Sequence, residues 1–167
     1  KNATDLQEDF LTNMFGCTSI PLDANSQRNA FNHLIIDTLG TDCSYNIIKN
    51  IHEILNDKIE EFKDTPEPLE IGKQDILQLF EDSGVPNSRI ENFDQTYDET
   101  IGQHTTLLAT NITNPKNFNI ETPDVVVKVN TEATDLVETQ VINGRQCLVI
   151  AINDHLEVNG IDVLSAK

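Results

Sequence analysis

A histidine and a glutamate within a predicted helix come closest in this chain to the spacing of a catalytic motif. His52 and Glu53 begin the sequence His-Glu-Ile-Leu-Asn. A zinc protease requires a second histidine four residues after the first, so that two imidazoles share one helix face and the glutamate acts as base. Asn56 occupies that position. We therefore predict no zinc site, and interpret His52 as a residue at the border of an apolar stripe.

Other metal-binding and nucleotide-binding motifs are absent from the sequence. Three further histidines have no cysteine or histidine at ligand spacing, namely His33, His104 and His155. The seven glycines form no phosphate-binding loop and no Gly-x-Ser-x-Gly elbow. Asp94, Asp98 and Glu99 cluster on a predicted helix instead of a glycine-centred calcium loop, so we interpret them as a solvated face. The sequence thus predicts no catalytic, cofactor-binding or metal-binding residue.

Cys43 is the one candidate nucleophile with a physical argument behind it. It precedes the N-terminus of a long predicted helix, where the helix dipole and the free N–H groups favour a thiolate. Because the sequence places no histidine beside it, we interpret Cys43 as a buried small hydrophobic residue. The wide spacing of Cys17, Cys43 and Cys147 argues against a disulfide framework and for a reducing compartment.

The elements that position these residues are predicted to be helical in the first part of the chain. Apolar residues at helical spacing predict helices over 4–16, 26–39 and 44–62, the second ending at Gly40. The run 64–68 contains two prolines and breaks the helical pattern. We therefore divide the chain into a helical segment, residues 1–65, and an α+β segment, residues 66–167. The two segments are expected to pack as one globular unit.

The second segment begins with a short strand over 69–71 and a helix pair. The first helix of the pair covers 74–82, and the second starts at the capping box Ser88-x-x-Glu91 and continues to Ile101. The pair resembles a helix-turn-helix, but the exposed face of the second helix carries mainly acidic residues, which do not read DNA. We interpret the pair as structural. Two more strands are predicted over 107–109 and 118–121.

The C-terminal part has the clearest strand pattern. Val125–Val129 is a β-branched run after a proline, and Asn143-Gly144 is a strong hairpin turn between strands 137–142 and 145–152. The face formed by Val137, Thr139, Val141, Gln146, Leu148, Ile150 and Ile152 is predicted to join the core. Asn159-Gly160 predicts a second short hairpin. The predicted fold class is α+β: N-terminal helices, then a helix pair, then a small and mainly antiparallel C-terminal sheet.

The net charge of −17 excludes some classes of partner. Acidic residues outnumber basic ones throughout the chain, and no block is basic. Such a surface repels phosphate backbones and anionic membranes, because non-specific nucleic-acid binding depends on lysine and arginine. No apolar run approaches the roughly 18 residues that a membrane span needs. We expect a protein partner, and neither a nucleic acid nor a membrane.

Several stretches resemble a known family. The sequences that carry the resemblance are AFNHLIIDTLGTDCSYNIIKNIHEIL, GVPNSRIENFDQTYDE, NFNIETPDVVVKVN, DLVETQVINGRQCLVIAIND and LEVNGIDV. They are similar to the C-terminal half of DUF4317, a family of uncharacterised proteins from gut Firmicutes. The resemblance implies that Lys1 begins the C-terminal portion of a longer, cytoplasmic bacterial protein. It implies no activity and no catalytic residue.

Two hypotheses from different classes remain. The first is a non-catalytic regulatory or protein-interaction module, motivated by the missing motifs, the acidity and a sheet edge that can accept a partner strand. The second is a hydrolase or transferase domain whose site is completed by a region preceding Lys1. That hypothesis requires Cys43, a histidine and a carboxylate within hydrogen-bond reach. Calcium-dependent binding by the acidic surface is a third alternative.

Overall fold

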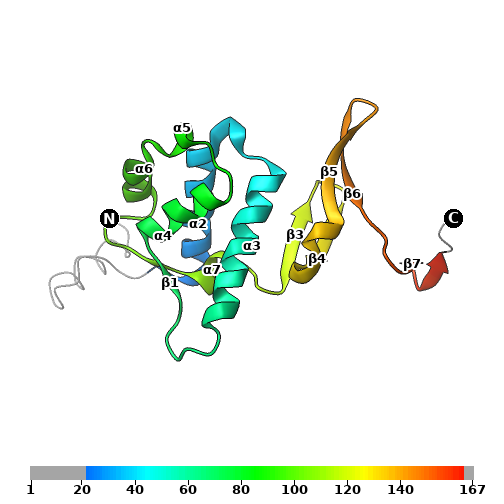
Figure 1. The fold of residues 1–167 in the computed structure, drawn as a ribbon, viewed down its shortest axis with the longest axis horizontal. Helices are drawn as coiled ribbons and strands as arrows, with labels where there is room; N and C mark the ends of the chain where they lie inside the picture. Colours follow the sequence, from blue (N-terminus) through cyan, green and yellow to red (C-terminus); the bar gives the residue numbers. More distant parts are fainter. Residues whose placement is uncertain (1–21, 164–167) are drawn as a thin grey trace, which may run out of the picture.

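The computed structural model describes residues 22–163, so the predicted helix over 4–16 and Cys17 lie outside the described residues. The described helices are α2 (Ala24–Leu39), η1 (Gly40–Asp42), α3 (Tyr45–Phe62), α4 (Lys73–Asp82), α5 (Asn87–Ile90), α6 (Phe93–Thr100), α7 (Ala109–Ile112) and η2 (Thr131–Leu136). The strands are β1 (Glu70–Ile71), β2 (Leu107–Leu108), β3 (Asn117–Glu121), β4 (Val126–Asn130), β5 (Val137–Ile142), β6 (Arg145–Ile150), β7 (Leu156–Val158) and β8 (Ile161–Val163). The fold is α+β, with helices first and most strands later (Figure 1).

The two long helices, α2 and α3, lie where the sequence predicts them. The Asp23 carboxylate caps α2 by accepting the backbone N–H of Ser26 at 2.9 Å, and Gly40 ends the helix with a φ of +52°. The Ser44 hydroxyl caps α3 by accepting the N–H of Ile47 at 3.4 Å. Each cap satisfies an N–H group that has no partner within its helix. The predicted bounds, 26–39 and 44–62, are therefore confirmed closely.

One hydrophobic core joins α2 and α3 to the segments that follow residue 65. Its buried side chains are Phe31, Leu34, Ile35, Leu39, Ile51, Leu55, Ile71, Ile76, Leu79, Phe80, Val85, Phe93, Tyr97, Ile101, Leu107, Ala109 and Ile112. The ring of Phe93 packs edge-on against that of Phe80 at 5.6 Å between centroids, and lies 5.9 Å from that of Tyr97. We call residues 22–113, which contain this core, the helical body.

A buried glutamine fixes α2 to the short β1–β2 ladder. Glu70 pairs with Leu108 and Ile71 with Leu107, so the strands predicted over 69–71 and 107–109 form one antiparallel pair. The amide of Gln27 donates to the carbonyl of Leu22 at 2.9 Å and accepts the N–H of Leu108 at 2.8 Å. Both polar ends of this buried side chain are thereby satisfied, which removes the cost of burying them.

The second helix of the predicted pair is interrupted. The sequence predicts one helix from the capping box Ser88-x-x-Glu91 to Ile101, whereas the structure has two helices, α5 and α6. Asn92 stands between them with a φ of −106° and a ψ of 20°. Asparagine favours such breaks because its side chain competes with the helix for backbone hydrogen bonds. The prediction of a single helix is wrong; after the break, Phe93 and Tyr97 are both buried in the core.

Residues 117–163, which we call the β extension, contain three separate antiparallel hairpins: β3–β4, β5–β6 and β7–β8. Asn143 and Gly144, with φ values of +50° and +76°, form the predicted turn between β5 and β6. Val137 pairs with Ile150, which confirms the predicted register. A second turn at residues 159–160 joins β7 to β8. The hairpins are therefore confirmed, but each ladder has only two strands and they do not form one continuous sheet.

The face of β5–β6 that the sequence assigns to the core is largely uncovered. Val137, at the base of the hairpin, is buried, but Val141 is 75% exposed and Ile150 is 51% exposed. The hairpin lies on the opposite side of α3 from α2 and α4, so those helices cannot cover its outer half (Figure 1). The prediction of a buried face is therefore wrong beyond the base of the hairpin.

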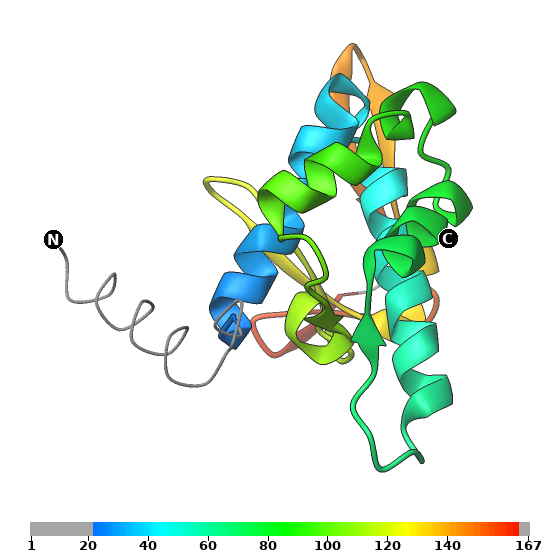
Figure 2. The same ribbon diagram turned by 90° about the vertical axis from the view of Figure 1, so that its left-hand side faces the viewer.

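The β extension contacts the helical body chiefly along α3. The hydroxyl of Tyr45 donates to the carbonyl of Val137 at 3.4 Å, and the hydroxyl of Thr134 donates to the carboxylate of Glu53. The ring of Phe118 on β3 packs edge-on against that of Tyr45, with 6.1 Å between centroids. Viewed from the side of the body, the strands of the extension lie behind the helices (Figure 2). The extension is thus attached at one side only.

Candidate functional site

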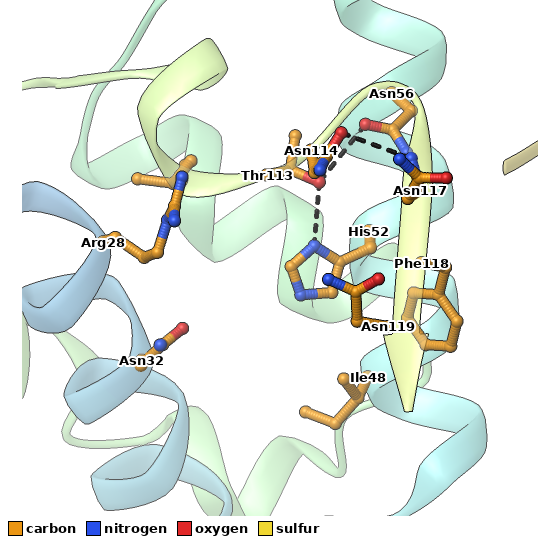
Figure 3. A pocket seen from close by; sticks show the side chains of 11 residues that line it. Arg28, Asn32, Ile48, His52, Asn56, Thr113, Asn114, Asn117, Phe118 and Asn119 are labelled. Carbon is orange, nitrogen blue, oxygen red and sulfur yellow. Dashed lines mark hydrogen bonds between the residues drawn. The ribbon is translucent and has the colours of Figure 1, made fainter. Parts of the chain in front are cut away.

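A polar pocket of about 290 Å³ lies where the helical body meets the β extension. Its walls come from α2, α3, the segment after α7 and β3 (Figure 3). The lining residues, which define what we call the asparagine pocket, are Arg28, Asn32, Ile48, His52, Asn56, Ile112, Thr113, Asn114, Asn117, Phe118 and Asn119. Five of these are asparagines, and none is acidic. The chain as a whole has a net charge of −17, whereas the lining of this pocket contains an arginine and no carboxylate.

Three side chains form a hydrogen-bonded chain in the wall of the pocket. His52 Nδ1 lies 2.9 Å from Thr113 Oγ1, and Thr113 Oγ1 donates to Asn56 Oδ1 at 3.2 Å. Because a hydroxyl has one proton and Thr113 gives it to Asn56, the hydroxyl must accept its other bond from the Nδ1–H of His52. This arrangement assigns the lone pair of the imidazole to Nε2, which has no hydrogen-bond partner among residues 22–163.

The charge state of His52 follows from its surroundings. The side chain is partly buried between α3, Thr113 and the ring of Phe118, whose centroid lies 6.0 Å from that of the imidazole. Burial lowers the pKa of His52 below its ordinary value, because the charged imidazolium loses solvation. The ring is therefore neutral at neutral pH, and Nε2 acts as a hydrogen-bond acceptor towards the pocket.

Arg28 and Asn32 face His52 from the opposite wall, which is formed by α2 (Figure 3). The Nε–H of Arg28 donates to the carbonyl of Asn111 at 3.3 Å, so the guanidinium is held at the rim. Within residues 22–163 no carboxylate lies within ion-pair distance of Arg28. Its two terminal nitrogens are therefore available to a ligand.

A turn at Asn114 positions the β3 wall of the pocket. Its side-chain Oδ1 accepts the backbone N–H of Lys116 at 2.9 Å and that of Asn117 at 3.2 Å. Asparagine commonly closes turns in this way, because its side chain reaches the backbone two residues further on. The turn directs the chain from α7 into β3, where Phe118 and Asn119 complete the pocket.

The structure separates Cys43 from every group that could activate it. Cys43 precedes α3, as predicted, but its side chain is exposed, so the interpretation as a buried hydrophobic residue is wrong. The helix begins with Ser44, whose side chain caps it in the polar environment of the surface. Among residues 22–163, no histidine or carboxylate is hydrogen-bonded to Cys43. The constellation that the enzyme hypothesis requires is not formed in the described part of the chain.

The acidic residues of α6 are engaged by their neighbours. Asp98 forms an ion pair with Lys73 at 2.5 Å, and Glu99 accepts a hydrogen bond from Gln95 at 2.8 Å. Lys73 also lies over the ring of Tyr97, 5.6 Å from its centroid. The two contacts of Lys73 fix α6 to α4.

A cluster that the sequence reasoning missed lies on the β7–β8 hairpin. Ligand atoms of His155, Glu157 and Asp162 lie within 4.8 Å of one another, and all three side chains are exposed. The signal was available, because Glu157 and Asp162 are cross-strand partners in the predicted hairpin. His33, by contrast, has only a local contact: its Nδ1 lies 2.9 Å from the carbonyl of Asn29, one turn earlier in α2.

The asparagine pocket was also missed, for a different reason. Its lining residues come from positions 28 to 119, so no short motif contains them. The only local sign was the i, i+4 spacing of His52 and Asn56. That spacing does place both side chains on one face of α3, where they share Thr113 instead of a metal.

The β extension has a second surface of interest. Of the twelve large apolar side chains that are exposed in residues 22–163, ten lie between Val125 and Val163. They are Val125, Val126, Val141, Ile142, Ile150, Ile152, Leu156, Val158, Ile161 and Val163. Residues 117–163 also contain eight acidic residues and only two basic ones. Free strand edges, apolar side chains and negative charge therefore occur together on one part of the molecule.

Comparisons with known proteins identify one family. In the described part of the chain, no helix combines the length and the apolar character needed to span a membrane. No curated protein and no solved structure matches the chain. The model of one family, described as a domain of unknown function (DUF4317), matches residues 1–161 of the 167. The chain, with its helical body and its hairpins, therefore belongs to the DUF4317 family.

Proposed function

We propose that this chain is a non-catalytic protein-interaction module whose β5–β6 hairpin binds an extended, basic and partly apolar segment of a partner protein. The observation behind the proposal is the exposure of apolar side chains on a ladder of only two strands. Val141 and Ile150 on one face and Ile142 on the other are 75%, 51% and 44% exposed. Soluble proteins rarely leave such groups uncovered on a free edge without a binding role.

The edges of the hairpin supply the hydrogen bonds for such a partner. In a two-stranded antiparallel ladder, half of the backbone N–H and C=O groups of each strand point away from the other strand. Val137, at the base of β5, uses its outward groups within the molecule: its carbonyl accepts from Tyr45 and its N–H donates to the carbonyl of Thr134. Beyond this base, β5 and β6 have no other strand beside them in the described part of the chain, so their outward backbone groups are open to a partner strand. An extended segment can join either edge as a third strand, with its alternate side chains on the apolar face.

The charge of the β extension selects the partner. With eight acidic residues against two basic ones, this region attracts a positively charged segment and repels a second copy of itself. The charge also disfavours nucleic acid as a partner. We also propose that the protein acts in a bacterial cytoplasm. Cys43 and Cys147 are both free thiols, which supports a reducing compartment.

A pair of short synthetic peptides tests the proposal with the full chain. One peptide alternates valine with lysine, and the other alternates valine with glutamate. We expect the lysine peptide to bind at least about tenfold more tightly, and to protect outward amides of β5 or β6 from hydrogen exchange. Equal binding of both peptides, or protection confined to the helical body, would overturn the proposal.

Two matched variants locate the binding site. Val141→Lys places a positive charge on the hairpin, whereas Ile36→Lys places it on an exposed apolar position of α2 that is 57% exposed. We expect Val141→Lys to weaken binding of the lysine peptide about tenfold and Ile36→Lys to change it less than about twofold. If both variants behave alike, the hairpin is not the site. The wild-type chain could also form a dimer that Val141→Lys dissociates. In that case the strand edge binds a second copy of the chain, and the proposal is overturned.

A further inference from the structure

We propose that the asparagine pocket binds a small hydroxylated carboxylate of about the size of a monosaccharide acid. In this arrangement the carboxylate lies on the guanidinium of Arg28, and the hydroxyl groups lie among His52 and the asparagines. This function is separate from the strand-binding role of the β5–β6 hairpin. It rests on the four features of the pocket that follow.

The first feature is a cation that has no acidic partner among residues 22–163. The Nε–H of Arg28 is used by the carbonyl of Asn111, which orients the guanidinium but leaves its terminal nitrogens free. Two parallel N–H donors match the two oxygens of a carboxylate. Since no acidic residue lines the pocket, nothing in its wall competes with a ligand for this charge.

The second feature is the single positive charge. The imidazole of His52 is neutral in this environment, so Arg28 is the only charged group among the lining residues. One cation balances one carboxylate. A phosphate ester carries close to two negative charges at neutral pH, and the second would remain unbalanced in a protein with a net charge of −17. The charge therefore favours a carboxylate over a phosphate.

The third feature is the direction of the imidazole. The chain from His52 through Thr113 to Asn56 fixes the proton on Nδ1 and turns Nε2 towards the pocket as an acceptor. Nε2 can accept a hydrogen bond from a hydroxyl group but not from an ionised carboxylate, which has no proton to give. A ligand that satisfies both Arg28 and His52 must therefore have an anionic group and a hydrogen-bond donor, and a hydroxyl group supplies that donor without adding a second charge.

The fourth feature is the set of amides. Each asparagine offers two donors and a carbonyl acceptor, which suits hydroxyl groups because these both donate and accept. Asn32 from α2 and Asn119 from β3 lie on opposite walls, and the ring of Phe118 is on the β3 side (Figure 3). The volume of about 290 Å³ lies just below the roughly 300–1,000 Å³ typical of small-molecule sites, so the ligand must be small. A single sugar ring is the appropriate size.

Four probes test the class of ligand on the full chain. D-glucuronate has the carboxylate and the hydroxyl groups, D-glucose lacks the charge, acetate lacks the hydroxyl groups and glucose 6-phosphate carries a second charge. We expect glucuronate to bind at least about tenfold more tightly than each of the others. Binding is measured from shifts of the His52 ring signals and of the backbone amides of Thr113 and Asn119.

Matched arginine variants locate the interaction. Arg28 and Arg145 are both exposed, and only Arg28 lines the pocket. We expect Arg28→Gln to weaken glucuronate binding about tenfold or more, and Arg145→Gln to change it by less than about twofold. Equal losses in both variants would show a general charge effect and overturn the proposal. So would equal affinity for glucose, acetate or glucose 6-phosphate, or glucuronate shifts located outside the pocket.

Failure of this test leaves the hairpin proposal intact, because the two sites share no residue. Conversely, a wild-type affinity for glucuronate in Val141→Lys would show that the pocket works independently of the hairpin. A loss of glucuronate binding in Val141→Lys as large as that in Arg28→Gln would overturn the assignment to the pocket, since Val141 is not among its lining residues.

Discussion

The helical body and the β extension are both rich in apolar residues at regular spacing, but the body buries many of them and the extension buries few, such as Val129 and Val137. Phe31, Leu55 and Ile76 in the body have no exposed surface, whereas Val141 and Ile161 in the extension are 75% and 70% exposed. The periodicity correctly predicts α2 and α3 in the body and β5 and β6 in the extension. The comparison teaches that periodicity determines which face is apolar, and that another element must be present to cover it.

The difference has a geometric cause. In the body, α2, α3, α4, α6 and α7 surround a common core, so each helix covers part of another. In the extension, each hairpin is an isolated two-stranded ladder, and such ladders are marginally stable without a covering element. The following predictions test this contrast, from the largest expected effect to the smallest.

The strongest test compares two truncations of apolar side chains. Phe93→Ala removes a fully buried ring that contacts Phe80 and Tyr97, so we expect the free energy of unfolding to fall by about 3–5 kcal/mol. Val141→Ala removes methyl groups that are mostly in contact with water, and we expect a change within about 0.5 kcal/mol. Urea unfolding measures the free energy of unfolding of both variants. A similar loss in both variants would show that the hairpin is packed as tightly as the body.

The end of the helical body that faces the asparagine pocket is tested at Thr113. Its hydroxyl is buried and bonded to both His52 and Asn56. Thr113→Val leaves those two groups without their partner, and we expect a loss of about 1–3 kcal/mol in the free energy of unfolding. The matched control is Thr110→Val, one turn earlier on exposed surface, with an expected change within about 0.5 kcal/mol. Equal effects of the two variants would argue that the hydrogen-bonded chain of His52, Thr113 and Asn56 does not stabilise the helical body.

Changing one glycine in each region to alanine introduces the same kind of backbone strain in the body and in the extension. Gly84 in the body and Gly144 in the extension have φ values of +89° and +76°, and an added Cβ would meet no atom within 4 Å at either position. Each change to alanine therefore costs only backbone strain, about 1–2 kcal/mol. We expect Gly84→Ala to lower the free energy of global unfolding by this amount.

Gly144→Ala should act only locally. We expect faster hydrogen exchange in β5 and β6, by about tenfold, while the amides of the body keep their wild-type exchange rates. A loss of global stability in Gly144→Ala equal to that in Gly84→Ala would mean that body and extension unfold together. That result would end the distinction between the two regions.

The smallest effect concerns how the free energy of unfolding depends on pH through Tyr97, a core residue of the body. Burial, together with the negative charges of Asp75 and Asp98, raises the pKa of Tyr97 to about 12. The hydroxyl also donates to the carbonyl of Thr105 at 2.6 Å. Because the folded state keeps its proton while the unfolded chain loses it near pH 10, stability from this group is complete below pH 10 and is lost as the pH rises towards 12.

Tyr97→Phe checks this dependence. We expect a loss of about 1 kcal/mol at neutral pH from the missing hydrogen bond, and a weaker fall in stability between pH 10 and pH 12 than in the wild type. Urea unfolding across that pH range gives both quantities. An unchanged slope would show that Tyr97 ionises in the folded state at an ordinary pH.

Much of the fold could be predicted from the sequence, since local patterns determine it. Helices α2 and α3 follow from apolar spacing and from caps such as Ser44, and the turns at residues 143–144 and 159–160 follow from Asn-Gly. The break at Asn92 could not be predicted, because a capping box and helical spacing both favoured a continuous helix. The exposed face of β5–β6 could not be predicted either, because alternation does not reveal which element, if any, lies opposite.

The candidate site was less predictable than the fold. The i, i+4 spacing of His52 and Asn56 predicts that they share a helix face. Thr113, however, is 57 positions after Asn56, and Arg28 belongs to another helix. Isolated asparagines resemble ordinary surface residues, and only the tertiary structure shows that five of them surround one volume. A search for local motifs detects metal sites and phosphate loops, and it has no means of detecting a set of dispersed amides.

The continuity of the core across residue 65 has a consequence for synthesis on the ribosome. Helices α2 and α3 leave the exit tunnel first, and the residues that cover them, up to Ile112, follow later. Until Ile112 has emerged, side chains such as Phe31 and Leu55 remain in contact with water, where chaperones can bind them. The nascent chain thus passes through a vulnerable interval that closes before the hairpins have left the exit tunnel.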